Sequence, residues 1–516
     1  MPQFPLETAD ALVMAAYLVG ILGFGFWASR RQGTAEDYFL AGRSLTWPLI
    51  GASLFASNIS SSSFIGLSGD AYRTGISVYN YEWFAAVALV LFAVVFLPLY
   101  LKARVYTLPE YLGLRFDTRV RLYVSGAGIV TNIMLEAAGA LYGSALVVKL
   151  LFPDVPLWVA VAALGLFTGL YTITGGLKAV VYTDAIQALV VMAGALAVAV
   201  GVMSRVEWGA VVAATPEASR HLIQPVGSEG VPWPALLTGL PLLGIYYWCS
   251  SQYVVQRALG AKTLAEGQRG AMLAGVLKLP LLFVVVLPGL YARVLYPELG
   301  RPDLVFPTMI FDVLPVGVRG AVLVALLAAL MSSLDSTLNS AATLVTMDFV
   351  RRFRPGISSE ALVRIGRWVT VAVLVLGVAW APQVDRFPSL WQYLQTTLAY
   401  LTPPIAACFL FGALWRRANA HGAVGALATG AVLALGLLLA GPAFHFLYVA
   451  AVVFAGSACA LVAVSLLTAP PAEDTAALVW TREMAGVEPD VRWYLDYRYQ
   501  AAVLLALTAA IVLVFR

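Results

Sequence analysis

A run of polar side chains interrupts an apolar stretch near the N-terminus: residues 54–66 read LFASNISSSSFIG. Helical periodicity alone cannot turn the four successive hydroxyls of Ser60 to Ser63 away from lipid. One interpretation is close helix packing through small residues. The other, which we favour, is a local unwinding that frees backbone carbonyls near Ala56 and Ile59 to coordinate a cation.

The composition around this run is that of a membrane protein. Of 516 residues, 61% are hydrophobic and 12% are charged, with a mean hydropathy of +0.84, whereas soluble domains carry about 25% charged residues. About 20 apolar residues span the hydrocarbon core as a helix. We therefore predict an all-α membrane protein with about 14 transmembrane helices, near residues 6–28, 47–71, 77–101, 119–151, 156–174, 176–203, 233–256, 270–296, 304–349, 361–381, 386–412, 420–440, 443–468 and 498–515.

The charged residues predict an orientation. Segment 6–28 lacks a preceding basic region and is followed by Arg30 and Arg31, so we expect a retained span rather than a cleaved signal. Lys and Arg, Arg257 among them, gather in the loops that this orientation places in the cytoplasm. We predict a multi-pass protein of the cell (inner) membrane, in contact with lipid, with both termini outside and no nucleic-acid partner.

A second polar interruption lies five spans after the first: residues 244–252 read GIYYWCSSQ. An odd spacing reverses the direction of crossing, as expected of two inverted five-helix repeats whose first helices are discontinuous. We divide the chain into an extra helix and loop (1–46), a transport core (47–412), and three C-terminal helices (413–516). The longest loops are 204–232, outside, and a cytoplasmic connector at 469–497, where we expect a short amphipathic piece.

A cluster of small and hydroxyl side chains fills residues 328–340, AALMSSLDSTLNS. Ala329, Ser332, Ser333 and Ser336 recur at helical spacing and share one face. That face offers one carbonyl and three hydroxyls, which suit a hard cation. Small-residue packing is the alternative, but Asp335 argues against it because a charge inside a span is costly and usually functional.

Four further ionisable residues lie in or at the ends of spans: Glu82, Glu136, Asp184 and Lys278. Glu82, Glu136 and Lys278 could pair with one another. Together with Gln395 and Trp391 they predict a cavity of hydrogen-bonding groups with an aromatic wall, as polyhydroxy ligands require.

Enzyme motifs are not found. The chain has no Walker loop, zinc pattern or nucleophile elbow, and its three cysteines lie in apolar segments without metal-ligand spacing. We therefore expect no enzyme, and uphill transport would draw on an ion gradient.

Seven stretches, taken in order, resemble the sodium–solute symporter family, and within it the bacterial sodium–sugar transporters. They are ASLFASNIS (52–60), YEW (81–83), YTLPEY (106–111), GGLKAVVYTDAIQ (175–187), QYVVQR (252–257), LPVGVRG (314–320) and SSLDSTLNS (332–340). The resemblance runs from about residue 35 to 465. It implies a leucine-transporter-like core of ten helices, here the second to eleventh spans, with one helix before and three after.

The resemblance also implies sodium (Na+) as the coupling ion and positions for its ligands. By position, the family's sodium site falls on Ala56, Ile59, Ala329, Ser332 and Ser333. A second site, present in some members, would use Asp184, Ser332, Asp335 and Ser336. The family often has a hydroxyl or alanine where this chain has Asp335.

The sugar site carries over in part. Glu82, Lys278 and Gln395 match sugar-contacting positions, and Tyr247 matches an aromatic gate. Three positions depart from the pattern: Ser63 replaces a glutamine, and Gly244 and Glu136 each replace an asparagine. The fourth span has no arginine to bind a carboxylate, which weighs against sialic acid.

We therefore expect sodium-coupled symport of a small polar solute into the cell by alternating access, and we favour a sugar or polyol as that solute. Within the same class, a monocarboxylate, amino acid or vitamin is the alternative. A channel or sodium-sensing membrane protein is a less favoured class, and a membrane enzyme is the least favoured.

Overall fold

The computed structural model describes residues 7–28, 34–172, 176–441, 444–486 and 492–516, and within these ranges the chain is helical without a β-strand. Two isolated bridges, Leu45 with Ala261 and Gln224 with Pro232, are the exceptions. Arg30 and Arg31, which supported the predicted orientation, lie outside the described residues, as does Gly175 of one quoted motif.

The α-helices differ greatly in length, because some are whole spans and others are parts of broken ones. Their bounds in chain order are α1 Thr8–Ala28, α2 Ala35–Leu40, α3 Trp47–Asn58, α4 Ser61–Thr74, α5 Asn80–Leu91, α6 Leu97–Ala103, α7 Leu108–Arg115, α8 Thr118–Thr131, α9 Ala138–Leu151, α10 Leu157–Thr172, α11 Leu177–Met203, α12 Trp208–Ala214, α13 Trp233–Leu237, α14 Gly239–Ile245, α15 Gln252–Leu259, α16 Leu264–Lys278, α17 Leu287–Leu295, α18 Val305–Val313, α19 Val318–Leu344, α20 Arg351–Phe353, α21 Ser359–Trp380, α22 Leu390–Leu401, α23 Pro403–Leu414, α24 Ala420–Ala440, α25 Phe446–Leu467, α26 Glu473–Ala476 and α27 Tyr497–Phe515.

Five π-helical turns join some of these helices into longer rods: η3 Phe92–Phe96, η4 Asn132–Ala137, η6 Tyr246–Ser250, η7 Leu282–Val286 and η9 Val345–Val350. Such turns are rare and frequently accompany functional sites, because the wider turn shifts side chains out of the regular helical register. Three of the five carry residues of interest here: Glu136 on η4, Tyr247 on η6 and Asp348 on η9.

Nine rods of the described part are long and apolar enough to cross a membrane, and α22 with α23, bent by 54°, make a tenth. The nine are Ile76–Ala103, Thr118–Lys149, Leu177–Met203, Leu264–Leu295, Val318–Phe353, Ser359–Arg386, Ala420–Ala440, Phe446–Leu467 and Tyr497–Phe515. Two apolar helical stretches, Thr8–Ile21 and Leu157–Gly169, are shorter. Length and composition therefore establish nine or ten spans.

Both polar interruptions break a helix. In the first, α3 ends at Asn58 and α4 begins at Ser61; Ser60 is the extended N-cap, and its hydroxyl accepts a hydrogen bond from the Ser63 amide. In the second, η6 ends at Ser250, and the extended Ser251 separates it from α15. The unwinding predicted from the serine run is confirmed.

The structure adds detail to two of the expected segments. Segment 304–349 is two helices, α18 and α19, because Pro315 and the positive-φ Gly317 (φ +85°) interrupt it. In the described part of the 469–497 connector, the helical pieces are the short α26 and two 3₁₀ turns, Arg482–Ala485 and Trp493–Leu495.

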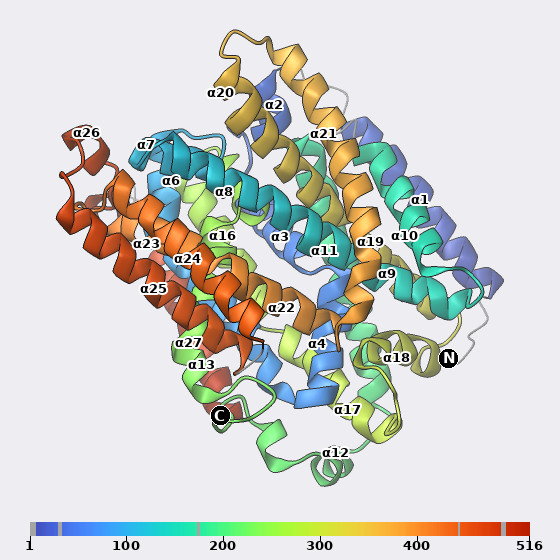
Figure 1. Ribbon diagram of the computed structural model, residues 1–516. Helices are drawn as coiled ribbons and strands as arrows, with labels where there is room; N and C mark the ends of the chain where they lie inside the picture. The colour runs from blue at the N-terminus through green and yellow to red at the C-terminus, as the bar shows by residue number, and fades with distance from the viewer. Residues whose placement is uncertain (1–6, 29–33, 173–175, 442–443, 487–491) are drawn as a thin grey trace.

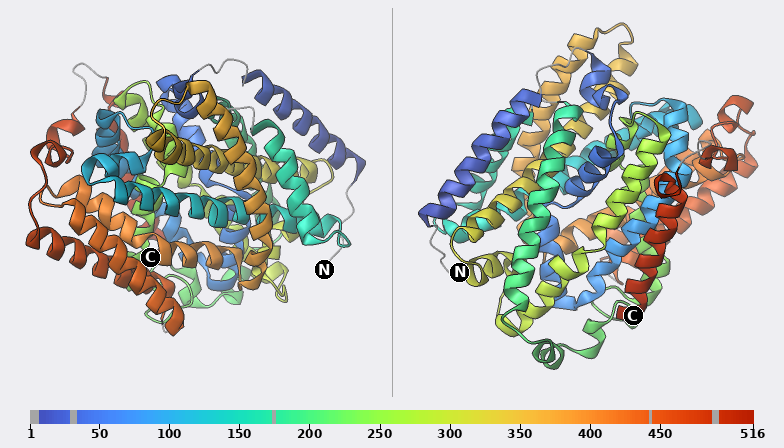
Figure 2. Two further views of the ribbon diagram at one scale, coloured as in Figure 1. Left: turned by 45° about the horizontal axis from the view of Figure 1, so that its top comes forward. Right: turned by 180° about the vertical axis from the view of Figure 1, so that it is seen from behind.

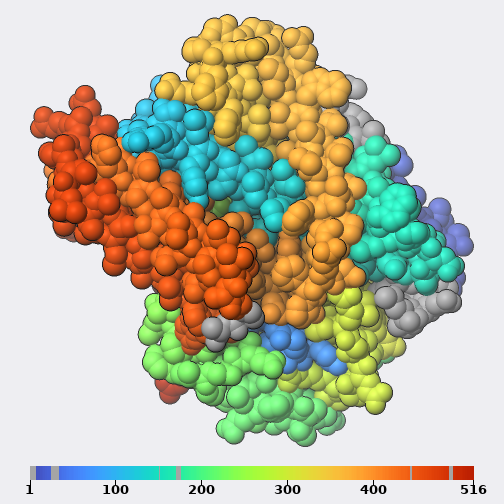
Figure 3. Space-filling model, viewed as in Figure 1, coloured from blue at the N-terminus to red at the C-terminus, as the bar shows by residue number. Residues whose placement is uncertain are grey.

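The helices form one bundle around α3, α11 and α19, which pack against one another (Figure 1). The start of α1, the C-terminal residue and α12 lie towards one end, and α20 and α26 towards the other, in both Figure 1 and the rear view of Figure 2. The pair α24 and α25 covers one side of the molecule (Figure 3). Its outer face exposes large apolar side chains such as Val432 and Leu439, which suits contact with lipid.

Candidate functional site

The break between α3 and α4 deprives two carbonyls of their helical donors. In a continuous helix the Ser60 amide would bond Ala56 O and the Ser63 amide would bond Ile59 O. Instead, the Ser60 amide donates to Asn58 O (3.1 Å) and the Ser63 amide to Ser60 O (3.0 Å). The carbonyls of Ala56 and Ile59, both predicted as sodium ligands, are thereby left without these bonds.

The central helix α19 lies against this break. The Ser333 hydroxyl donates to Ser57 O at 3.1 Å, and the Tyr253 hydroxyl of α15 donates to the same carbonyl. The structure therefore brings the predicted Ser333 directly to the unwound segment, and backbone and hydroxyl oxygens meet there. Ala329 precedes Ser333 by one turn and is fully buried.

A buried carboxylate organises the neighbouring hydroxyls. Asp184 of α11 accepts hydrogen bonds from Ser332 (2.6 Å), Ser53 (2.5 Å) and Ser57 (3.2 Å). The Ser57 hydroxyl is also 2.9 Å from that of Ser336. Asp184, Ser332 and Ser336, predicted together, therefore belong to one polar network that joins α3, α11 and α19.

Arg257 belongs to the same network and corrects an expectation. Counted by position as a cytoplasmic loop cation, it lies on α15 with 1% of its surface exposed. Its Nε is 4.0 Å from Asp184 and donates to the Ser53 hydroxyl at 3.0 Å. Its Nη1 donates to the carbonyls of Tyr253 and Val254. The guanidinium thus balances the Asp184 charge inside the bundle.

Asp335, the remaining residue predicted for the second sodium site, is fully buried in α19, within electrostatic range of Tyr17 of α1. Ser332 and Ser336, on the same helix, bond towards α11 and α3.

A cavity of about 90 Å³ opens beside the break, several times the volume that one water requires. Six of the seven predicted solute-binding residues line it: Ser63, Glu82, Glu136, Tyr247, Trp391 and Gln395. The seventh, Lys278, is not among the lining residues and pairs with the Glu82 carboxylate. Sequence reasoning did not select Asn58, Tyr81 or Trp248, which also line the cavity. Asn58 and Trp248 lie in the two polar interruptions, and Tyr81 lies in one of the stretches that carry the family resemblance.

The three charges of this region do not form one cluster. Lys278 Nζ is 2.7 Å from Glu82 Oε2, donates to the Asn58 side-chain oxygen, and lies 5.3 Å from the centre of the Trp248 ring. Glu136 forms no ion pair or hydrogen bond with another residue of the described ranges. The expected pairing therefore holds for Glu82 and Lys278 and does not extend to Glu136.

Local packing explains why Gly244 stands where the family pattern has an asparagine. Gly244 lines the cavity, and a Cβ built there would lie 2.5 Å from Cδ1 of Phe84. An asparagine at this position would require the phenylalanine to move.

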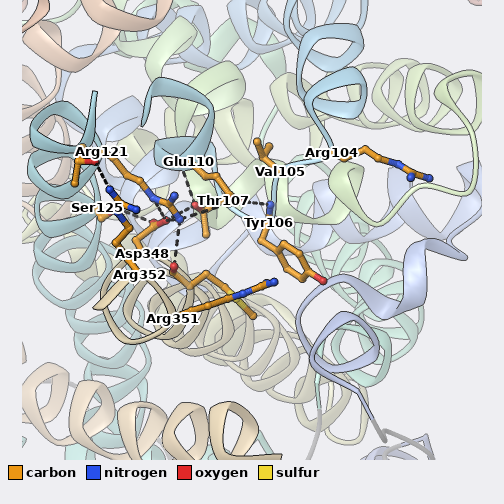
Figure 4. A network of polar contacts seen from close by, with 12 residues as sticks. Arg104, Val105, Tyr106, Thr107, Glu110, Arg121, Ser125, Asp348, Arg351 and Arg352 are labelled. Carbon is orange, nitrogen blue, oxygen red and sulfur yellow. Dashed lines mark hydrogen bonds and ion pairs between the residues drawn. The ribbon is translucent and has the colours of Figure 1, made fainter. Parts of the chain in front are cut away.

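A second polar network lies at one end of α8 and was not anticipated (Figure 4). Asp348 of η9 is fully buried and accepts hydrogen bonds from Thr107 (2.7 Å), Ser125 (2.7 Å) and Arg121 Nε (2.8 Å). Arg121 also lies 3.6 Å from Glu110, which accepts a bond from the Tyr106 amide. This network ties the 104–107 loop to α8 and to the end of the central rod.

Comparison with known proteins gives a consistent result. The model of the sodium:solute symporter family matches residues 38–430. Sodium/glucose cotransporter 4 of Danio rerio is 34% identical, over 93% of this chain and 82% of the relative. Sodium/myo-inositol cotransporter 2 of Oryctolagus cuniculus is 33% identical, over 92% of this chain and 79% of the relative.

Solved structures share the fold at lower identity. A Na+-coupled sialic acid symporter in a substrate-bound outward-open state superposes with a TM-score of 0.80 at 24% identity, covering 90% of this chain and 99% of that one. The nucleobase-cation-symport transporter Mhp1, in a closed conformation, gives 0.59 at 15% identity, covering 87% and 99%.

Proposed function

The chain belongs to the sodium:solute symporter family, and from this premise we propose that it carries a sugar or polyol into the cell by alternating access. Membership makes it a multi-pass membrane transporter that couples its solute to sodium. Curated relatives named for glucose and for myo-inositol transport support a polyhydroxy cargo.

The observation that carries this proposal is a single cavity at a broken helix. The cavity brings together an amide (Gln395), a hydroxyl (Ser63) and a neutralised ion pair (Glu82 with Lys278) beside aromatic rings. Hydroxyl groups of a sugar can donate to and accept from such groups, and its apolar ring face can rest on aromatic side chains.

For sodium, we assign a first binding site where the unwound segment meets α19. Its ligands would be the carbonyls of Ala56, Ile59 and Ala329 and the hydroxyls of Ser332 and Ser333. Neutral oxygen donors suit a transported ion, because binding must be weak enough to permit release. A second sodium-binding site would use Asp184, Ser332 and Ser336, with Asp335 as the expected fourth ligand.

Sodium bound at the first site would bridge α3 and α19 and stabilise the break. It would thereby shape the adjoining cavity. The coupling is reciprocal, so solute raises sodium affinity by the factor by which sodium raises solute affinity. Each sodium that enters down about 100 mV releases roughly 2.3 kcal/mol. That energy supports a solute gradient of roughly fiftyfold, since 1.4 kcal/mol corresponds to a factor of ten.

For the architecture, we propose fourteen spans. The two shorter apolar helices and the two broken helices, α3 with α4 and α13 to α15, would complete the ten that length and composition establish. The two breaks then begin two inverted five-helix repeats within a core at 47–412, preceded by the unit 1–46 and followed by 413–516. In the cell (inner) membrane both termini would face outside, and the Asp348 network would close the cytoplasmic side.

The direct test is uptake of radiolabelled sugars and polyols into proteoliposomes under an inward sodium gradient. Replacing external sodium with choline is expected to abolish accumulation. Unchanged accumulation in choline would contradict sodium-coupled transport of that solute.

A further inference from the structure

The solute cavity is lined by one acidic group, Glu136, for which the described residues supply no ion-pair partner. Glu82 is neutralised by Lys278 at 2.7 Å. Glu136 lines the same cavity from η4, remains partly exposed to it, and meets no hydrogen-bond donor or ion-pair partner anywhere in the described ranges. The cavity therefore presents one neutral pair and one free carboxylate.

Arg257, the cation that interacts electrostatically with Glu136, makes its contacts with other groups. Arg257 interacts with Glu136 electrostatically, and its Nε lies 4.0 Å from Asp184. Its nitrogens donate to the Ser53 hydroxyl and to two backbone carbonyls of its own helix. Arg257 is therefore shared among Asp184, Ser53 and two backbone carbonyls, and it forms no ion pair with Glu136 among the described contacts.

A free carboxylate in the middle of a membrane protein is costly unless something balances it. A neutral sugar supplies hydroxyl donors but no charge, so closing the cavity around it would leave Glu136 either as an unbalanced anion or protonated. A solute with a protonated amino group would cancel that charge and form a charge-assisted hydrogen bond, which is stronger than a neutral one.

The walls of the cavity suit such a cation. Tyr81, Tyr247, Trp248 and Trp391 all line it, and aromatic faces attract ammonium groups. Trp248 already has the Lys278 ammonium near its ring. Gln395, which makes no hydrogen bond to another residue of the described ranges, remains available for hydroxyl groups.

We propose that Glu136 pairs with a protonated amino group of the solute, so that the preferred cargo is an amino sugar or amino polyol. This inference rests on the proposed sugar or polyol transport and narrows its substrate class. Glu82, Lys278 and Gln395 bind hydroxyl groups, and Glu136 selects the amine.

The test is sodium-driven uptake into proteoliposomes of three matched tracer pairs: glucosamine with glucose, galactosamine with galactose, and glucamine with sorbitol. N-acetylglucosamine serves as a control that retains the nitrogen without its charge. We expect at least one amine to exceed its neutral partner by about tenfold or more in uptake at low concentration, as a charge-assisted bond allows, and N-acetylglucosamine to behave as a neutral sugar.

The variant Glu136→Gln keeps the shape of the side chain and removes its charge, and it should bring the ratio of amine to neutral uptake to about one. Glu473→Gln, the same change at an exposed position of α26, should keep the wild-type ratio. If the Gln variant does not fold, the wild-type ratios alone decide.

The outcomes separate the two proposals. Sodium-driven uptake of neutral sugars without an amine preference, or a preference that survives in Glu136→Gln, would overturn the role of Glu136 alone. If Glu136→Gln changed the sodium dependence of uptake but kept the amine preference, the proposed role of Glu136 would be overturned as well. Accumulation of neither neutral nor amino compounds would overturn both proposals.

Discussion

Glu136 and Asp348 are both acidic side chains on π-helical turns inside the bundle, and they differ in the donors that they meet. Asp348 accepts bonds from Thr107, Arg121 and Ser125, whereas Glu136 accepts none from the described residues. The rod of α8, η4 and α9 supplies two of the Asp348 donors at one end and Glu136 further along.

The difference separates two uses of buried charge. A carboxylate surrounded by donors holds helices together, because removing it leaves its partners unsatisfied. A carboxylate without donors gains no such stabilisation in the empty protein, and under our proposal Glu136 serves the solute instead. The following variants test this contrast.

The largest effect is expected for Asp348→Asn. The change leaves the Arg121 guanidinium, 14% exposed, without its nearest counter-charge, and we expect a loss of about 3 kcal/mol in stability, as for other broken buried pairs. Thermal unfolding of the purified protein in detergent measures it, with the exposed Asp474→Asn as control. An unfolding temperature equal to that of the wild type would contradict a structural role for this network.

Asp303, which lies between spans, is expected to have an effect on stability between those of Asp348 and Glu136. It accepts the Leu390 amide at the start of α22, at 3.1 Å and 3.2 Å to its two oxygens, and burial raises its pKa to about 6. Because the folded state binds this proton more tightly than the unfolded state, stability should fall by roughly 2 kcal/mol as pH rises from about 4 to above 6.

Asp303→Asn should therefore flatten the dependence of the unfolding temperature on pH over this range. The exposed Asp474→Asn should leave the wild-type slope in place. A slope in Asp303→Asn as steep as in the wild type would show that another group titrates there.

The smallest effect on stability is expected for Glu136→Gln. Removing an unpartnered charge breaks no bond, so the solute-free protein should keep its stability or gain up to about 1 kcal/mol. The same unfolding assay measures it without added solute. A loss as large as that of Asp348→Asn would mean that Glu136 has a structural partner, and the contrast between the two residues would fail.

Much of the fold followed from chemistry that is local in sequence. Four serines in an apolar stretch predicted the break at Ile59 and Ser60, because hydroxyls and freed carbonyls need partners that lipid cannot supply. Pro315 and Gly317 are equally local signals, and they could have predicted the division of segment 304–349 into α18 and α19.

The network residues were harder to predict because their partners are distant in sequence. Arg257 follows a span and resembles a loop cation, and only the position of Asp184 and Ser53 shows that it is buried. Asp348 likewise resembles a solvated residue at a helix end until Thr107, Arg121 and Ser125 are placed around it. Which of Glu82 and Glu136 pairs with Lys278 depends on helix packing that periodicity does not determine.

The central claim is that sodium binds where the unwound segment meets α19. The most direct measurement is the sodium concentration for half-maximal solute uptake in the wild type, in Ser333→Ala and in Ser457→Ala. Ser457 is a buried serine of α25 whose hydroxyl donates to Val453 O of its own helix at 2.8 Å. Losing one hydroxyl ligand should raise that concentration about tenfold in Ser333→Ala and leave it unchanged in Ser457→Ala. Equal values in all three proteins would contradict the claim.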